Sequence, residues 1–134
     1  AVDRTLSSSD RDETTMVRFL AMSLVAATAF TTAAIADTFS PLKNEADFVS
    51  LVSGKDLIRF GVNVQVTPEG EITGRGFGRD VTGAWQWRDG YFCRDLFWGE
   101  RDLGANCQLV KVRGNTLRFT SDRGAGQDAA LKLR

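Results

Sequence analysis

The chain has 134 residues and no net charge, with 43% hydrophobic and 25% charged side chains. That length and composition suit one globular domain and leave no room for a second full one. Acidic and basic side chains also balance closely after residue 36, which argues against a dedicated nucleic-acid binder and against electrostatic capture by an anionic membrane surface. We expect neither partner, and we expect a monomer.

The first 36 residues indicate targeting sequence rather than folded structure. Residues 1–15 are polar and aperiodic, and we interpret them as a non-native or upstream extension before an initiator Met16. Residues 16–36 combine an early cation with an apolar run and the small-x-small triplet at 34–36, as in a signal peptide. A transmembrane anchor is the alternative, but the apolar run is short and no cationic flank follows it. The sequence therefore predicts cleavage after Ala36, a periplasmic location, and a single mature domain at 37–134 without a membrane span.

A short helix is predicted near the start of the mature domain. Asn44 can cap its first turn, and the apolar residues Phe48, Leu51 and Val52 recur at helical spacing. Gly54 can end the helix. We expect this helix to lie against the sheet that follows it, or to plug it.

From residue 57 the apolar period changes from about 3.6 to about 2, which indicates strands. Turn signals stand at 68–70 (PEG), 89–90 (DG) and 114–115 (GN), and residues 98–105 and 122–128 are predicted as loops. The predicted strands are 57–66, 71–78, 81–88, 91–97, 107–113, 116–121 and 129–134.

This pattern predicts a mainly β fold. One short N-terminal helix is followed by an antiparallel meander of about seven strands, which forms a small barrel or half-barrel because closure removes exposed strand edges. Gly74, Gly76 and Gly78 share one face of the second strand, so a bulky side chain can pack there. We expect the tryptophans of the next strand, Trp85 and Trp87, to do so.

The two cysteines, Cys93 and Cys107, are predicted to form a disulfide. An exported chain matures in an oxidising compartment, and the hairpin expected near residue 100 brings the two residues opposite each other. Closing a loop of this length contributes about 3 kcal/mol in the chain-entropy model. A two-thiolate metal site is the alternative, but the chain has no histidine and no third cysteine. We predict no metal and no cofactor.

The densest cluster of aromatic and basic side chains lies between residues 83 and 98. The predicted binding residues are Trp85, Trp87, Arg88, Phe92, Arg94 and Trp98. Because side chains alternate along strands, part of this cluster is expected to be exposed, and exposed rings beside guanidinium groups suit stacking on a sugar, a ring or a partner protein. The alternative is that both aromatic layers only pack against the helix and the sheet.

The sequence identifies no catalytic residue. Five carboxylates could supply an acid and a base for hydrolysis, namely Asp80, Asp89, Asp95, Glu100 and Asp102. Each of them lies beside an arginine in the sequence or at a turn, as surface ion pairs do. No histidine is present, and no serine or cysteine has the setting of a nucleophile.

Residues 47–134 resemble a group of small exported bacterial proteins of unknown function. The segments that carry the resemblance are 48–54 (FVSLVSG), 83–94 (GAWQWRDGYFCR), 106–110 (NCQLV) and 124–126 (GAG). Members of this group are often labelled dihydrodipicolinate reductase, which implies a nicotinamide-dependent enzyme with a histidine pair and an active-site lysine. This chain has no histidine and no dinucleotide-binding loop between a parallel strand and a helix. No catalytic residue is therefore carried over.

Two classes of function follow from these observations. The one we favour is a non-enzymatic periplasmic module that binds a small molecule or an envelope protein, or protects the envelope, through the aromatic cluster. The alternatives are a small hydrolase that uses carboxylates near Asp95 and Asp102, and the reductase that the label implies.

Overall fold

The structure is a computed structural model that describes residues 38–134. The predicted extension at 1–15 and the predicted signal peptide at 16–36 lie outside the described residues. The elements in chain order are β1 (Ser40–Pro41), α2 (Glu45–Val52), β2 (Leu57–Arg59), β3 (Val62–Val66), β4 (Glu71–Gly76), β5 (Arg79–Arg88), β6 (Tyr91–Trp98), β7 (Arg101–Arg113), β8 (Thr116–Thr120), the 3-10 turn η1 (Asp122–Gly124) and β9 (Asp128–Leu133).

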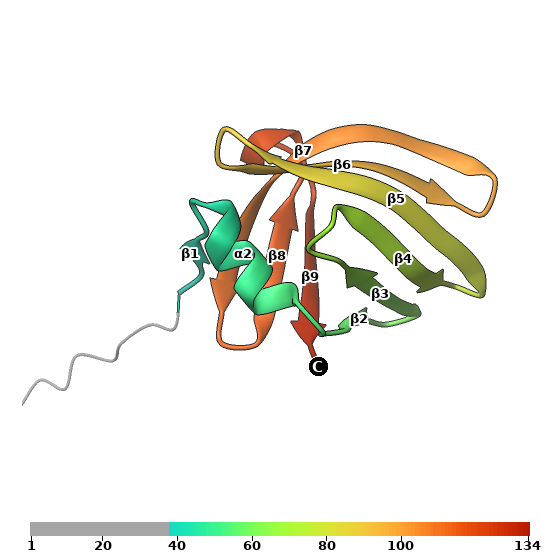
Figure 1. The fold of residues 1–134 in the computed structure, drawn as a ribbon, viewed down its shortest axis with the longest axis horizontal. Coiled ribbons are helices and arrows are strands. Elements are labelled where there is room, and N and C mark those ends of the chain that lie inside the picture. The colour runs from blue at the N-terminus through green and yellow to red at the C-terminus, as the bar shows by residue number, and fades with distance from the viewer. Residues whose placement is uncertain (1–37) are drawn as a thin grey trace, which may run out of the picture. The chain divides into compact units, whose positions relative to one another are not determined.

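The strands form a closed antiparallel barrel, which confirms the predicted fold class. Each of its eight strands, β2 to β9, pairs with its neighbours in the sequence, and the pairing of β2 with β9 closes the ring. The short β1 pairs with β7 near Lys111 and Val112. Figure 1 shows β5, β6 and β7 running together across the top of the barrel, with β8 and β9 crossing them steeply.

Hairpin turns fix the register of the barrel. At the predicted Asp89-Gly90 turn both residues have positive φ, 53° and 84°, as a two-residue turn that matches the strand twist requires. Arg88 therefore pairs with Tyr91, and every residue of β6 is assigned a partner on β5 by counting outward from that pair. Tight turns of this kind leave little freedom for strands to slip.

Two predicted elements were wrong in their boundaries. The strand expected at 57–66 is a hairpin of β2 and β3, because the chain turns at Phe60 and Gly61, where Gly61 has φ of 75° and Phe60 is 92% exposed. The loop expected at 98–105 is mostly strand, since β7 starts at Arg101 after a short turn at Gly99. At the first place apolar residues continue to alternate with others through the turn, so the pattern does not show where the chain reverses. At the second the polar run Glu100, Arg101 and Asp102 is typical of a loop, although Arg101 and Asp102 pair with β6.

The helix α2 forms where it was predicted. The side chain of Asn44 accepts a hydrogen bond of 2.9 Å from the Asp47 N–H, which satisfies one of the free donors of the first turn. Gly54, with φ of 70°, follows the last turn and lets the chain leave in a left-handed conformation. No helix among the described residues is long and apolar enough to cross a membrane.

Phe48 attaches α2 to the interior of the barrel. Its side chain is fully buried, and its ring centroid lies 5.1–5.3 Å from those of Trp85, Trp87 and Phe92 and 6.4 Å from that of Phe119. These partners come from β5, β6 and β8, so one ring from the helix bridges strands on different sides of the barrel. Figure 1 shows α2 lying beside β8, as the Phe119 contact requires.

Phe48→Ala is expected to lower the free energy of unfolding by about 3–5 kcal/mol, because it leaves a cavity among four aromatic rings. Urea denaturation followed by tryptophan fluorescence measures the change. Ser50→Ala, on the exposed side of the same helix, is the control and should change stability by no more than about 0.5 kcal/mol. Equal losses in both variants would show that Phe48 does not anchor the helix.

Candidate functional site

The barrel forms an open cavity of about 730 Å³, within the size range of small-molecule pockets. Every one of the strands β2 to β9 contributes to its wall. Most of the wall is aliphatic or aromatic, and the residues that form this apolar part include Leu57, Val62, Val64, Val66, Ile72, Val81, Leu96, Ala129 and Leu131. A pocket of this kind binds through apolar contact and uses its few polar groups for orientation.

Two aromatic rings form the floor of the cavity. Phe92 and Phe119 line it and also belong to the cluster around Phe48, with ring centroids 5.4 Å apart. Both are buried, at 4% and 6% exposure. The helix therefore supports the cavity from behind without entering it.

Three of the six predicted binding residues line this cavity: Phe92, Arg94 and Trp98. They alternate along β6 and so share its inner face. The indole N–H of Trp98 donates a 2.6 Å hydrogen bond to the Gly76 carbonyl, and the Arg79 guanidinium lies 4.6 Å from the Trp98 ring centroid. A tryptophan does pack at the glycine face of β4, as predicted, but it comes from β6 and not from β5.

The other three predicted residues lie elsewhere. Trp85 is 4% exposed and donates from its indole N–H to the Thr67 carbonyl at 2.9 Å, while Trp87 stacks on Phe48. These two tryptophans therefore pack in the core, as the alternative interpretation expected. Arg88 is exposed on the outside of the barrel, where it donates to the Gln86 side chain at 2.9 Å.

Arg94 is the half-buried cation of the cavity wall. One of its nitrogens, Nη1, donates a 2.7 Å hydrogen bond to the Gly104 carbonyl. Burial lowers the pKa of Arg94 below its usual value, and the neighbouring negative charge of Asp95 acts in the opposite direction. Within residues 38–134 the ion pair formed is Arg75–Asp80, on the surface, so no carboxylate pairs with Arg94 there.

Exposed residues of the lining mark the mouth of the cavity: Arg59, Phe77, Leu103, Gln127 and Asp128. The ring of Phe77 lies edge-on to that of Phe60, with centroids 6.4 Å apart, so two phenyl rings from separate turns stand together at the rim. Phe60, Phe77 and Leu103 are 92%, 64% and 44% exposed. The mouth is therefore mixed, because these apolar side chains stand beside Arg59, Gln127 and Asp128. Its apolar part offers an apolar molecule a path to the cavity.

Phe77 combines exposure with an unfavourable backbone. Its φ is 48°, in the left-handed region where a bulky side chain costs about 1–2 kcal/mol relative to glycine or asparagine. The conformation belongs to the two-residue turn Phe77-Gly78 between β4 and β5, in which both residues have positive φ, 48° and 82°. Phenylalanine is an unusual residue at such a position.

Phe77→Asn is therefore expected to raise the free energy of unfolding by about 1 kcal/mol, since asparagine tolerates positive φ and little burial is lost. Thermal or urea unfolding measures the gain. Phe60→Asn is the matched control, because Phe60 is more exposed but is not at positive φ. A destabilised Phe77→Asn would mean that the ring contributes packing rather than strain.

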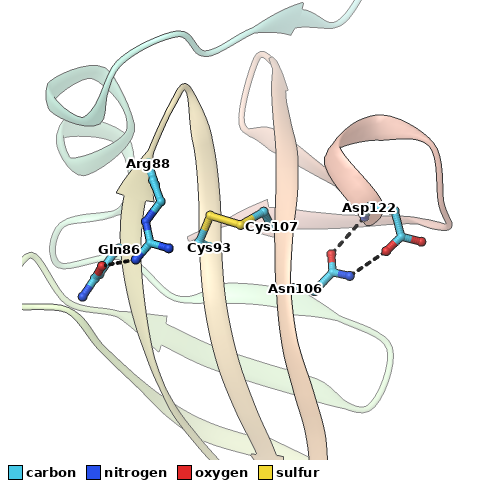
Figure 2. The surroundings of a disulfide bond; sticks show 6 residues. All are labelled: Gln86, Arg88, Cys93, Asn106, Cys107 and Asp122. Atoms are coloured by element: carbon cyan, nitrogen blue, oxygen red, sulfur yellow. Dashed lines mark hydrogen bonds between the residues drawn. A yellow bond between two sulfur atoms is a disulfide. The ribbon is translucent and has the colours of Figure 1, made fainter.

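Cys93, which precedes Arg94 on β6, forms a disulfide with Cys107 on the outer face of the barrel wall. The bond confirms the predicted pairing of the two cysteines. The two cysteines are direct cross-strand partners on β6 and β7. Figure 2 shows the bond crossing between these strands, with Asn106 reaching from β7 to Asp122. Asn106 donates to the Asp122 carboxylate at 2.8 Å and accepts from its backbone N–H at 2.9 Å. These contacts hold η1 against the barrel wall.

The hydrolase hypothesis needs a carboxylate inside a cleft. All five predicted carboxylates are exposed, namely Asp80, Asp89, Asp95, Glu100 and Asp102. Asp80 pairs with Arg75 at 2.9 Å, and the Asp102 carboxylate accepts from the Gly104 N–H at 2.7 Å. Their placement gives a hydrolytic acid–base pair no enclosed site. No group of three or more metal-ligating side chains occurs in residues 38–134.

Several cavity residues had no signal in the sequence. Val62, Val64 and Ala129 are ordinary strand residues, and Arg59 and Leu103 lie in segments whose turns were misplaced. They become a site only when the barrel closes. Arg94 could have been placed from the sequence. Counting residues outward from the Asp89-Gly90 turn makes Arg94 the cross-strand partner of Trp85, so both side chains lie on the same face of the hairpin.

Comparison with protein-family models, curated proteins and solved structures finds no match to this chain. The resemblance to the exported bacterial group stays a prediction.

Proposed function

We propose that this protein is a non-enzymatic binding module that holds a small apolar molecule inside its barrel. The cavity of about 730 Å³ carries the proposal, because its wall is mostly apolar and part of its exposed rim, at Phe77 and Leu103, is apolar as well. Small-molecule sites in proteins share this combination of an apolar wall and few polar groups.

The construction of the wall supports binding without a large rearrangement. The strands around the cavity are paired into a ring, the disulfide joins β6 to β7, and Phe48 supports the floor. A site that is already formed loses less conformational entropy when a ligand enters it. A small-molecule ligand is therefore favoured over an envelope protein.

We further propose that the mature protein is periplasmic. The Cys93–Cys107 disulfide supports this location, because such bonds persist in oxidising compartments. The signal-peptide pattern at 16–36 supports it from the sequence.

Binding can be tested with N-phenyl-1-naphthylamine, a neutral probe whose fluorescence rises in apolar surroundings. We expect saturable binding to the full chain, and we expect Ala129→Trp to weaken it by at least about tenfold, because the indole fills the cavity. Ala130→Trp is the matched control. Ala130 is the next residue of β9 and is exposed on the outside, so its substitution should leave probe binding unchanged.

Circular dichroism would first establish that both tryptophan variants fold. Should Ala129→Trp overpack the core, Val64→Phe reduces the same cavity from β3. Probe binding that survives in every folded cavity variant would place the probe elsewhere and contradict the proposal.

The location is tested by mass spectrometry of the natural protein before and after reduction. We expect the mass of a chain that begins at Asp37, because cleavage follows Ala36. Before reduction this mass should lie two hydrogens below that of the dithiol form, because the cysteines are joined. An intact N-terminus with free thiols would contradict export.

A further inference from the structure

The cavity lining carries two positive residues and one negative residue, and they differ in how far they are already bonded or solvated. The charged residues of the lining are Arg59, Arg94 and Asp128. Asp128 already accepts a hydrogen bond from the Thr120 hydroxyl at 2.5 Å. Arg59 is exposed at the mouth, where water solvates it. Arg94 is thus the one charged group of the lining that is partly removed from water.

Arg94 has bonding capacity that the protein does not use. A guanidinium group has five N–H donors in a rigid fork, and the hydrogen bond found for it goes to the Gly104 carbonyl. No side-chain carboxylate forms an ion pair with it in residues 38–134. A half-buried cation without a directly bonded anion is costly, and an anionic ligand would offset that cost through a charge-assisted, two-point hydrogen bond.

The apolar wall specifies the rest of the ligand. On one side of Arg94 lie the floor residues Phe92 and Phe119, and the walls from β3 and β4 present Val62, Val64 and Ile72. These side chains offer no hydrogen bonds. A molecule that satisfies both parts of the cavity has one anionic group attached to a hydrocarbon body.

We propose that the cavity binds an aliphatic carboxylate, with its carboxylate on the Arg94 guanidinium and its hydrocarbon chain against the apolar wall. The inference rests on the proposed function and adds the chemical class of the ligand. One half-buried cation matches the single charge of a carboxylate, whereas a phosphate monoester carries nearly two charges and more acceptors than Arg94 alone can satisfy. A cationic ligand would be repelled by Arg94 and Arg59.

The test compares dodecanoate with dodecanol as competitors of N-phenyl-1-naphthylamine at neutral pH, below the concentration at which either aggregates. The wild-type protein should bind dodecanoate about ten- to a hundredfold more tightly than Arg94→Gln does, as expected for a lost hydrogen bond to a charged group. Dodecanol affinity should change by no more than about threefold in that variant. Shortening the acid should weaken binding about three- to fourfold per methylene removed.

Two arginines serve as controls. Arg88→Gln removes an exposed cation from the outer wall, and Arg59→Gln removes the cation at the mouth. Arg88→Gln should keep the preference for the acid, and Arg59→Gln should reduce that preference less than Arg94→Gln does. Arg94→Lys retains the charge without the fork, so it should recover part of the preference if charge contributes and confirm that a loss in Arg94→Gln is not unfolding.

The outcomes separate the two proposals. If the probe and both competitors fail to bind, the proposed function and the ligand class are both wrong. If the alcohol binds the wild type as tightly as the acid, or Arg94→Gln weakens both equally, the binding module stands and the carboxylate assignment is overturned. Loss of the acid preference in Arg59→Gln instead of Arg94→Gln would also overturn the assignment to Arg94.

Discussion

The fold depends on β7 pairing with two different strands along its length. Residues 101–108 of β7 pair with β6, and residues 109–113 pair with β8. That change of partner lets β8 and β9 turn away from β5 and β6 (Figure 1), and the sheet closes into a ring where the first strand, β2, pairs with the last, β9. Without it the aliphatic residues of β3 and β4 would face solvent. The cavity, and with it every functional proposal, therefore follows from the length of one strand.

Aromatic side chains divide the interior of the barrel into a packed region next to the helix and the open cavity in which we propose that the ligand binds. Phe48, Trp85 and Trp87 fill the side next to the helix, where Phe48 contacts both tryptophans and none of the three lines the cavity. Phe92 and Phe119 belong to both regions. Because aromatic pairs contribute about 0.5–1.5 kcal/mol beyond the area that they bury, the cluster can stabilise the fold while leaving the other half of the barrel unfilled.

Sequence patterns predicted local structure better than they predicted the site. Asn44, the Asp89-Gly90 turn and the pairing of Cys93 with Cys107 are local signals with one physical solution each, and all three were confirmed. Phe60 and Gly61 were missed because alternation continues through their turn. The cavity was missed because its lining residues come together only when the strands close into a barrel. The aromatic cluster was expected in part on the surface, yet the hairpin register places Trp85 opposite Arg94 on the inner face.

The first half of β7 has a further consequence, for contact with other chains. Residues 101–108 pair with β6 on one side, and no strand within 38–134 pairs with them on the other. An open edge of this kind is a template onto which a second molecule can add a strand. Here Gly104 has φ of 78°, its N–H is bonded to Asp102 and its carbonyl to Arg94. The arginine that we assign to the ligand therefore also holds this irregular stretch of β7 in place, and an irregular edge is a poorer template for an added strand than a flat one.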